Sequence, residues 1–149
     1  MANAGCLVLL GDFSNERLDF DSVVHDFGWS VSRASSLSEL VEIGRSRTVV
    51  AVLVQNGALN MPLPEGLRAI RAAAPRGRII VCHNVGQAHS RTAMIEAGAF
   101  GVLLMPLAQS EVRQSLGFVW ASKITPLPHA ASPARKARVA ARAQQVGAA

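Results

Sequence analysis

The sequence predicts an α/β domain in which a parallel β-sheet carries helices on both faces, a doubly wound arrangement in three layers. Two patterns lead to this prediction. Four of five short strand-like segments are apolar runs without polar alternation, as strands are when both faces of a sheet are covered. Helical segments separate these runs, and strands joined by helices form parallel sheets with right-handed crossovers. Sites in such folds lie at the carboxyl ends of the strands.

The strands are predicted from the apolar runs themselves. The first is the continuous run CLVLL, and the second is the short segment WSVSRAS. The remaining three are TVVAVLV, RIIVC and GVLLM. These runs place the strands at 6–10, 29–35, 48–54, 78–82 and 101–105.

The helices are predicted from apolar spacing and from residues that begin or end helices. Gly28 ends the first helix and Ser36 begins the second. Pro64 lies near the start of the third helix, Pro75 lies at its end, and Gly98 closes the fourth. The fifth helix is the segment QSEVRQSLGFVWASK. The helices are expected at 15–28, 36–46, 64–75, 87–99 and 109–123.

The composition fits one globular domain in a reducing cytoplasm. The chain has 149 residues, of which 50% are hydrophobic and only 5% aromatic, so its core is aliphatic. Cys6 and Cys82 each lie in an apolar run, which predicts buried free thiols instead of a disulfide or a metal pair. The apolar stretch near the N-terminus is too short for a secretion signal, and no run is long enough for a membrane span.

The positive charge is concentrated at the end of the chain. The formal net charge is +5, and residues 1–122 are neutral in sum. We predict a domain at 1–123 and a Pro-, Ala- and Arg-rich linker or disordered basic tail at 124–149. The tail offers weak, salt-sensitive nucleic-acid contact as an alternative function. Its basic residues are Arg135, Lys136, Arg138 and Arg142.

Two segments carry a resemblance to a known family. GDFSNERL (11–18) comes directly after the first strand, and EAGAFGVLLMP (96–106) ends with a proline that closes the fifth. With these segments, residues 5–122 resemble a response-regulator receiver domain. The resemblance implies the CheY-like, flavodoxin-type three-layer sandwich, with five helices and strand order 2-1-3-4-5.

The phosphorylation chemistry of that family requires groups that this chain lacks. The family uses an acid pair for Mg²⁺, an Asp nucleophile, a Ser or Thr hydroxyl and a Lys. The matching positions here are Gly11-Asp12, Gln55, His83 and Met105. Because an amide does not form an acyl phosphate as a carboxylate does, we predict a degenerate pseudo-receiver without catalysis, metal or cofactor.

Several residues near this degenerate pocket keep more than one interpretation. Asp12 either caps the first helix or bonds loop amides, or else it binds a metal ion, and Ser14 is an equally good cap. His83 is either satisfied by a loop carbonyl or a catalytic base, and its position beside Gln55 leaves a role responsive to pH or a ligand open. The Met105-Pro106 bond either retains the cis form common in the family or does not. Loop 56–66 either folds over the vacated pocket or is a variable surface loop.

The resemblance implies a signalling role through protein contact. In the family, the face made by the fourth helix, fifth strand and fifth helix mediates dimers and partner binding. Such domains commonly precede a DNA-binding output domain in transcriptional or two-component regulation. A small-ligand-binding flavodoxin-like domain is the other alternative. The residues expected on the face here are Ala88, Arg91, Val102, Glu111 and Arg113.

Overall fold

A computed structural model of the chain describes residues 5–84 and 91–124. The chain divides into two units, Met1–Val119 and Trp120–Ala149, and the β-sheet belongs to the first. Ala88 and the four basic residues of the predicted tail lie outside the described residues. The predicted boundary at 123/124 stays a prediction.

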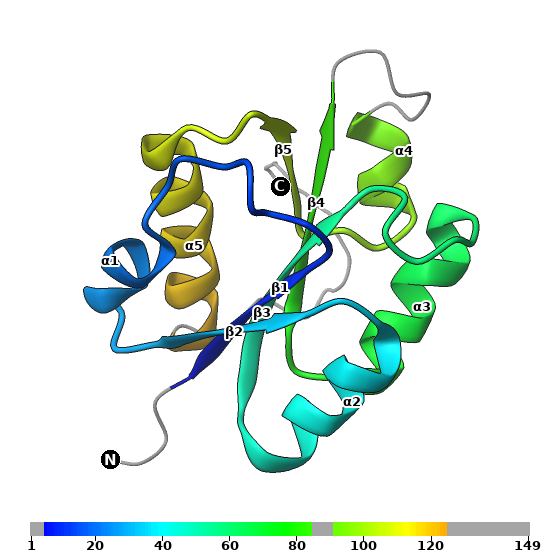
Figure 1. Cartoon of the computed structure of the whole chain (residues 1–149), viewed down its shortest axis with the longest axis horizontal. Coiled ribbons are helices and arrows are strands. Elements are labelled where there is room, and N and C mark those ends of the chain that lie inside the picture. Colours follow the sequence, from blue (N-terminus) through cyan, green and yellow to red (C-terminus); the bar gives the residue numbers. More distant parts are fainter. Residues whose placement is uncertain (1–4, 85–90, 125–149) are drawn as a thin grey trace, which may run out of the picture. The chain divides into compact units, whose positions relative to one another are not determined.

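Five strands alternate with five helices, as the sequence predicts (Figure 1). All neighbouring strands are parallel, and their order is β2-β1-β3-β4-β5. The predicted fold class and strand order are therefore confirmed. The strands are β1 (Cys6–Leu10), β2 (Ser30–Ala34), β3 (Val49–Gln55), β4 (Arg78–Asn84) and β5 (Gly101–Met105). The helices are α1 (Phe20–His25), α2 (Leu37–Ser46), α3 (Leu63–Ala73), α4 (Arg91–Glu96) and α5 (Gln109–Ile124).

The sheet lies between two helical layers. Helices α1 and α5 cover one face, and α2, α3 and α4 cover the other (Figure 1). Successive side chains of a strand point to opposite faces, so each central strand contributes to two cores. In β1, Leu7 and Leu9 belong to the cluster that includes Phe20 and Leu116, whereas Val8 belongs to the cluster on the other face. This double coverage explains the uninterrupted apolar runs.

Most predicted boundaries agree with the structure within about two residues, but the first helix is much shorter than expected. It begins at Phe20, where the side chain of Asp19 accepts a bond of 3.3 Å from the amide of Ser22. Ser14 is therefore not its cap, although Ser36 does cap α2 as predicted. The segment between β1 and α1 is consequently a long loop above the sheet.

Strand register brings distant residues to one edge of the sheet. Gln55 pairs with Cys82 of β4, and Asn84 pairs with Met105 of β5. The loop that begins at Gly11 starts from the same edge. The carboxyl ends of the four strands β1, β3, β4 and β5 thus meet there, as expected of a parallel sheet. None of the helices among residues 5–84 and 91–124 is both long and apolar enough to span a membrane.

Candidate functional site

The five residues predicted for the degenerate pocket all lie at the carboxyl edge of the sheet. Gly11 and Asp12 begin the loop after β1. Gln55 is the last residue of β3, His83 is the last but one of β4, and Met105 is the last of β5. The topology therefore gathers them at the edge where a doubly wound fold places its site.

Gln55 is bonded to the loop after β1. Its side-chain oxygen Oε1 accepts a hydrogen bond of 2.8 Å from the backbone amide of Asp12. Gly11 has a φ of 121° and lies against the same side chain, since an added Cβ would be 2.8 Å from the Cβ of Gln55. The side chain of Gln55 thus fills space beside the loop instead of leaving it open.

Asp12 is engaged within its own loop. Its Oδ1 accepts bonds of 2.6 Å from the hydroxyl and 3.0 Å from the amide of Ser14. These two bonds, the hydroxyl bond more than the amide bond, hold the pKa of the Asp12 carboxyl below its usual value. Asp12 therefore bonds within its loop and does not cap α1, whose cap is Asp19.

Glu16 is a site residue that the sequence reasoning missed. Its Oε1 accepts a bond of 2.6 Å from the amide of Leu107, in the loop after β5. Sequence analysis placed Glu16 in the first turn of a helix, where it would be an ordinary surface acid. Only the loop conformation of residues 14–19 lets this carboxylate reach across the edge of the sheet. The positions of the acidic residues along the sequence do not by themselves indicate such a contact.

His83 and Met105 differ in exposure. His83 is half-buried, and its Nδ1 lies 3.2 Å from the backbone oxygen of its neighbour Asn84, the last residue of β4. Met105 is buried at 7% exposure. The Met105-Pro106 peptide is cis, which settles the alternative left open for that bond.

The thiol of Cys82 lies beneath this edge in the core. Burial, and after it the negative charge of Glu16, raise the pKa of Cys82 to about 12. Cys82 and Cys6 are both buried free thiols, as predicted.

Loop 56–66 approaches the pocket from the β3 side. The Cβ of Ala58 would lie 3.2 Å from a Cβ added to Gly11. Leu59 packs against the core on the α2–α4 face together with Leu63, the first residue of α3. The loop thus reaches the neighbourhood of Gly11, in agreement with the interpretation that it folds over the pocket.

These groups set what the pocket can do. A neutral amide stands where a nucleophile would be needed, and its oxygen is already an acceptor from a backbone amide. Among the residues that the structure describes, no group of three His, Cys, Asp or Glu side chains is arranged to hold a metal ion. The hydrogen bonds at this edge join protein loops to one another.

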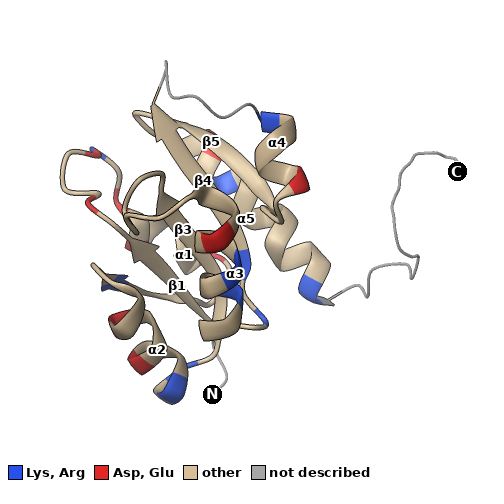
Figure 2. Ribbon diagram, turned by 90° about the vertical axis from the view of Figure 1, so that its right-hand side faces the viewer, with Lys and Arg blue, Asp and Glu red and all other residues tan. Residues whose placement is uncertain are grey.

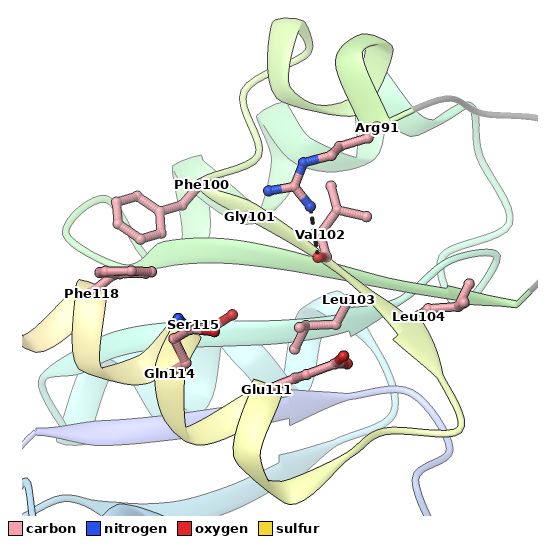
Figure 3. Close-up of a pocket in the computed structure, with 10 residues that line it drawn as sticks. All are labelled: Arg91, Phe100, Gly101, Val102, Leu103, Leu104, Glu111, Gln114, Ser115 and Phe118. Atoms are coloured by element: carbon pink, nitrogen blue, oxygen red, sulfur yellow. Dashed lines mark hydrogen bonds between the residues drawn. The ribbon is translucent and has the colours of Figure 1, made fainter. Parts of the chain in front are cut away.

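A second feature lies on the face formed by α4, β5 and α5. A shallow hollow of about 410 Å³ runs between β5 and α5, with Arg91 and Glu111 among its lining residues (Figure 3). Large apolar side chains are exposed on these three elements: Ile95 by 40%, Leu104 by 45% and Phe118 by 60%. β5 is an edge strand, so no further strand among residues 5–84 and 91–124 covers this side.

Val102 lines this hollow too, although its side chain is buried, and its backbone oxygen accepts a bond of 3.3 Å from Arg91. Arg113 turns toward α1, where its guanidinium lies 3.0 Å from the carboxylate of Asp26. Arg113 does not line the hollow, because successive residues of α5 point in different directions. Arg91 and Glu111 do line it as expected.

Solved receiver domains have the same fold. The chain is similar to a response-regulator receiver domain from Clostridium thermocellum, with a TM-score of 0.64, 19% identity, and 81% of this chain and 97% of that chain covered. It is also similar to a signal receiver domain of an HD domain-containing protein from Pseudomonas fluorescens Pf-5, with a TM-score of 0.65, 15% identity, and 81% of this chain and 98% of that chain covered. A third similar structure is a response regulator from Thermotoga maritima, with a TM-score of 0.61, 18% identity, and 79% of this chain and 99% of that chain covered. The chain therefore has the CheY-like receiver fold.

Sequence comparisons give no further assignment. No family model matches the chain. No curated protein matches it significantly.

Proposed function

We propose that this receiver-fold domain is a non-catalytic signalling module that works by protein contact and without phosphorylation. Its contact surface is the face of α4, β5 and α5, and the occupant is a second copy of the same chain. The process would be transcriptional or two-component regulation, as the shared fold with response-regulator receiver domains suggests. The resemblance of GDFSNERL and EAGAFGVLLMP to the family supports the same class.

The pocket supports a mechanism independent of phosphate. Phosphoryl transfer to a side chain needs a nucleophile, a cation site and donors for the transferred group. Gln55 offers a neutral amide, and Met105 is an apolar side chain at the end of β5. Asp12 is the one carboxylate at the matching acid pair, and Ser14 already donates two bonds to it.

The observation that carries the proposal is the apolar surface around the hollow. Exposed Leu104 and Phe118 lie on neighbouring elements and flank a depression, an arrangement typical of interaction sites. Aromatic side chains are enriched among the residues that dominate binding energy at interfaces.

Charge complementarity favours a second copy as the occupant. Arg91 and Glu111 line the same hollow but carry opposite charges. A two-fold symmetric pair would set Arg91 of one protomer against Glu111 of the other, because such an interface uses the same surface twice. The same arrangement would bury Phe118 of both protomers.

Sedimentation velocity on the full chain tests this proposal. We expect self-association that Phe118→Glu weakens by about tenfold or more, since it places a charge in an apolar contact. Arg91→Glu should weaken it as well, and the pair Arg91→Glu with Glu111→Arg should recover part of the loss. The matched control is Met61→Glu, because Met61 is 39% exposed but lies in the loop before α3.

Two results would overturn the proposal. One is a wild-type chain that stays monomeric at about 1 mM, where association of roughly −4 kcal/mol is still detectable. The other is association that Met61→Glu weakens as much as Phe118→Glu.

The alternatives make different predictions. Nucleic-acid binding by the basic tail would give salt-dependent retention on DNA that deletion of 124–149 abolishes. A ligand in the degenerate pocket would compete with the bond between Gln55 and Asp12. Because that oxygen is already engaged, protein contact is the function that the geometry favours.

A further inference from the structure

The loops at the carboxyl edge are joined by two hydrogen bonds that run from a side chain to a distant backbone amide. The first joins Oε1 of Gln55 to the amide of Asp12 at 2.8 Å. The second joins Oε1 of Glu16 to the amide of Leu107 at 2.6 Å. Together the two bonds, called the loop clasp below, connect β3, the loop after β1 and the loop after β5.

The first bond belongs to a closely fitted contact. A Cβ added at Gly11 would lie 2.9 Å from Oε1 of Gln55, so only glycine leaves room for this side chain. Gly11 also has a φ of 121°, in a region that side-chain-bearing residues rarely adopt. Ala58 borders the same space from the other side. The fit fixes the amide of Gln55 in one position against the loop.

The second bond uses a charged acceptor. A carboxylate that accepts from an N–H forms shorter and stronger bonds than a neutral oxygen. Glu16 and Leu107 are both half-buried, which lowers competition from water. Among the described residues, Glu16 forms no ion pair, so the amide of Leu107 is the partner recorded for this carboxylate.

The clasp ends next to the proposed contact surface. Leu107 lies two residues before Gln109, the first residue of α5. The first turns of α5 carry Glu111 and Gln114, which line the hollow beside β5. A rigid helix moves as a unit, so the position of the Leu107 amide helps to set where these side chains lie.

We propose that Gln55 and Glu16 are positioning residues, and that the loop clasp sets the start of α5 with protein groups alone. In this arrangement the side chain at the end of β3 acts on the loop after β1, and Glu16 carries the effect to the loop after β5. The inference deepens the proposed function and rests on it where it concerns the contact surface. The coupling between the two bonds does not depend on that function.

Amide hydrogen exchange measured by NMR on the full chain tests the clasp. Gln55→Ala should speed exchange at Asp12 by about tenfold, the usual effect of losing one such bond. If the bonds are coupled, the same variant should also speed exchange at Leu107 and shift the signals of Glu111 and Gln114. Glu16→Ala should produce the reciprocal changes at Asp12.

Control variants separate positioning from general destabilisation. Asn56→Ala removes an amide one residue away, and no hydrogen bond of the Asn56 side chain occurs within the described part of the chain. It should leave exchange at Asp12 and Leu107 within about twofold of wild type. Glu16→Gln keeps an oxygen acceptor and should recover most of the protection at Leu107. A denaturation midpoint measured for each variant identifies any that is unfolded, and if Glu16→Ala is unfolded, exchange at Leu107 in Gln55→Ala carries the test.

The outcomes are distinct. The loop clasp is overturned if each variant changes amide exchange only at its own bond. In that case exchange at Asp12 is unaffected by Glu16→Ala, and exchange at Leu107 is unaffected by Gln55→Ala. If amide exchange at Asp12 and Leu107 is coupled but the clasp variants self-associate as the wild type does, the loop clasp stands and its link to the contact surface is removed. Loss of self-association in Phe118→Glu tests the proposed function alone, because Phe118 has no part in either bond.

Discussion

The backbone of Gly11 lies directly against the side chain of Gln55, close enough that a Cβ on Gly11 would stand 2.8 Å from the Cβ of Gln55. The two residues are 44 positions apart in the sequence and meet because β1 and β3 are neighbours in the sheet. The absence of a side chain at 11 and the presence of the long amide at 55 are therefore one structural feature. Changing either residue alone leaves a collision or a gap.

We expect Gly11→Ala to lower the free energy of unfolding by about 2–4 kcal/mol. A residue with a side chain is strained at this φ of 121°, and the new Cβ also collides with atoms of Gln55. Gly57→Ala is the matched control, because Gly57 has a φ of 93° but nothing within 4 Å of an added Cβ. It should cost only about 1–2 kcal/mol. Urea unfolding measures both, and equal losses would contradict the close contact.

Magnesium and beryllofluoride should leave the pocket unchanged. The carboxylates of Asp12 and Glu16 already accept bonds from protein groups, and position 55 is an amide, so the site lacks the free oxygen ligands that Mg²⁺ requires and the nucleophile that phosphoryl mimics need. We therefore expect no saturable shifts at Asp12, Gln55 and His83 in amide NMR spectra titrated with Mg²⁺ and then beryllofluoride. Saturable shifts at these residues would show that the pocket still binds ions.

The carboxyl of Asp12 should titrate below its usual pKa in the folded chain. The hydroxyl and the amide of Ser14 both stabilise the ionised form, so the folded pKa lies below the unfolded one. The stabilisation is thus present above the ordinary pKa of 3.8 and is lost as the pH falls through the lowered value. Ser14→Ala should raise the pKa measured by carboxyl ¹³C NMR, whereas Ser14→Thr should keep it low. A pKa indifferent to Ser14→Ala would contradict this account.

Cys82 should resist thiol reagents in the folded chain. With a pKa of about 12, on the order of one molecule in ten thousand carries the reactive thiolate at pH 8. Cys6 is also buried, so both thiols should label only when the chain unfolds. Timed labelling with a chromogenic disulfide, with and without urea, measures this. Fast labelling of the native chain would show that the edge above Cys82 opens.

The sheet and most helices could be predicted because their signals are local or repeated. An uninterrupted apolar run such as CLVLL predicts a doubly covered strand, and Ser36 begins α2 through a bond to the nearby amide of Glu39. The start of α1 could not be predicted in the same way. Residues 14–19 have helix-compatible composition, but Ser14 bonds to Asp12 and Glu16 bonds to Leu107 instead.

The candidate site was predicted in part. The family resemblance brought Gly11, Asp12 and Gln55 together correctly, because equivalent strand ends meet in a parallel sheet. It did not reveal Glu16, whose partner lies 91 residues away. It also did not reveal the ion pair between Arg113 and Asp26, because Asp26 lies at the end of another helix.

The sequence by itself determined the alternation of strands and helices, and hence the fold class, because these depend on residue type and periodicity. Its resemblance to receiver domains implied the strand order. Only the tertiary structure decided what the side chains at the carboxyl edge contact. The bonds from Gln55 to Asp12 and from Glu16 to Leu107 form where separate loops converge. A hydrogen bond depends on distances of about 3 Å between specific atoms, and no pattern along the chain encodes those distances.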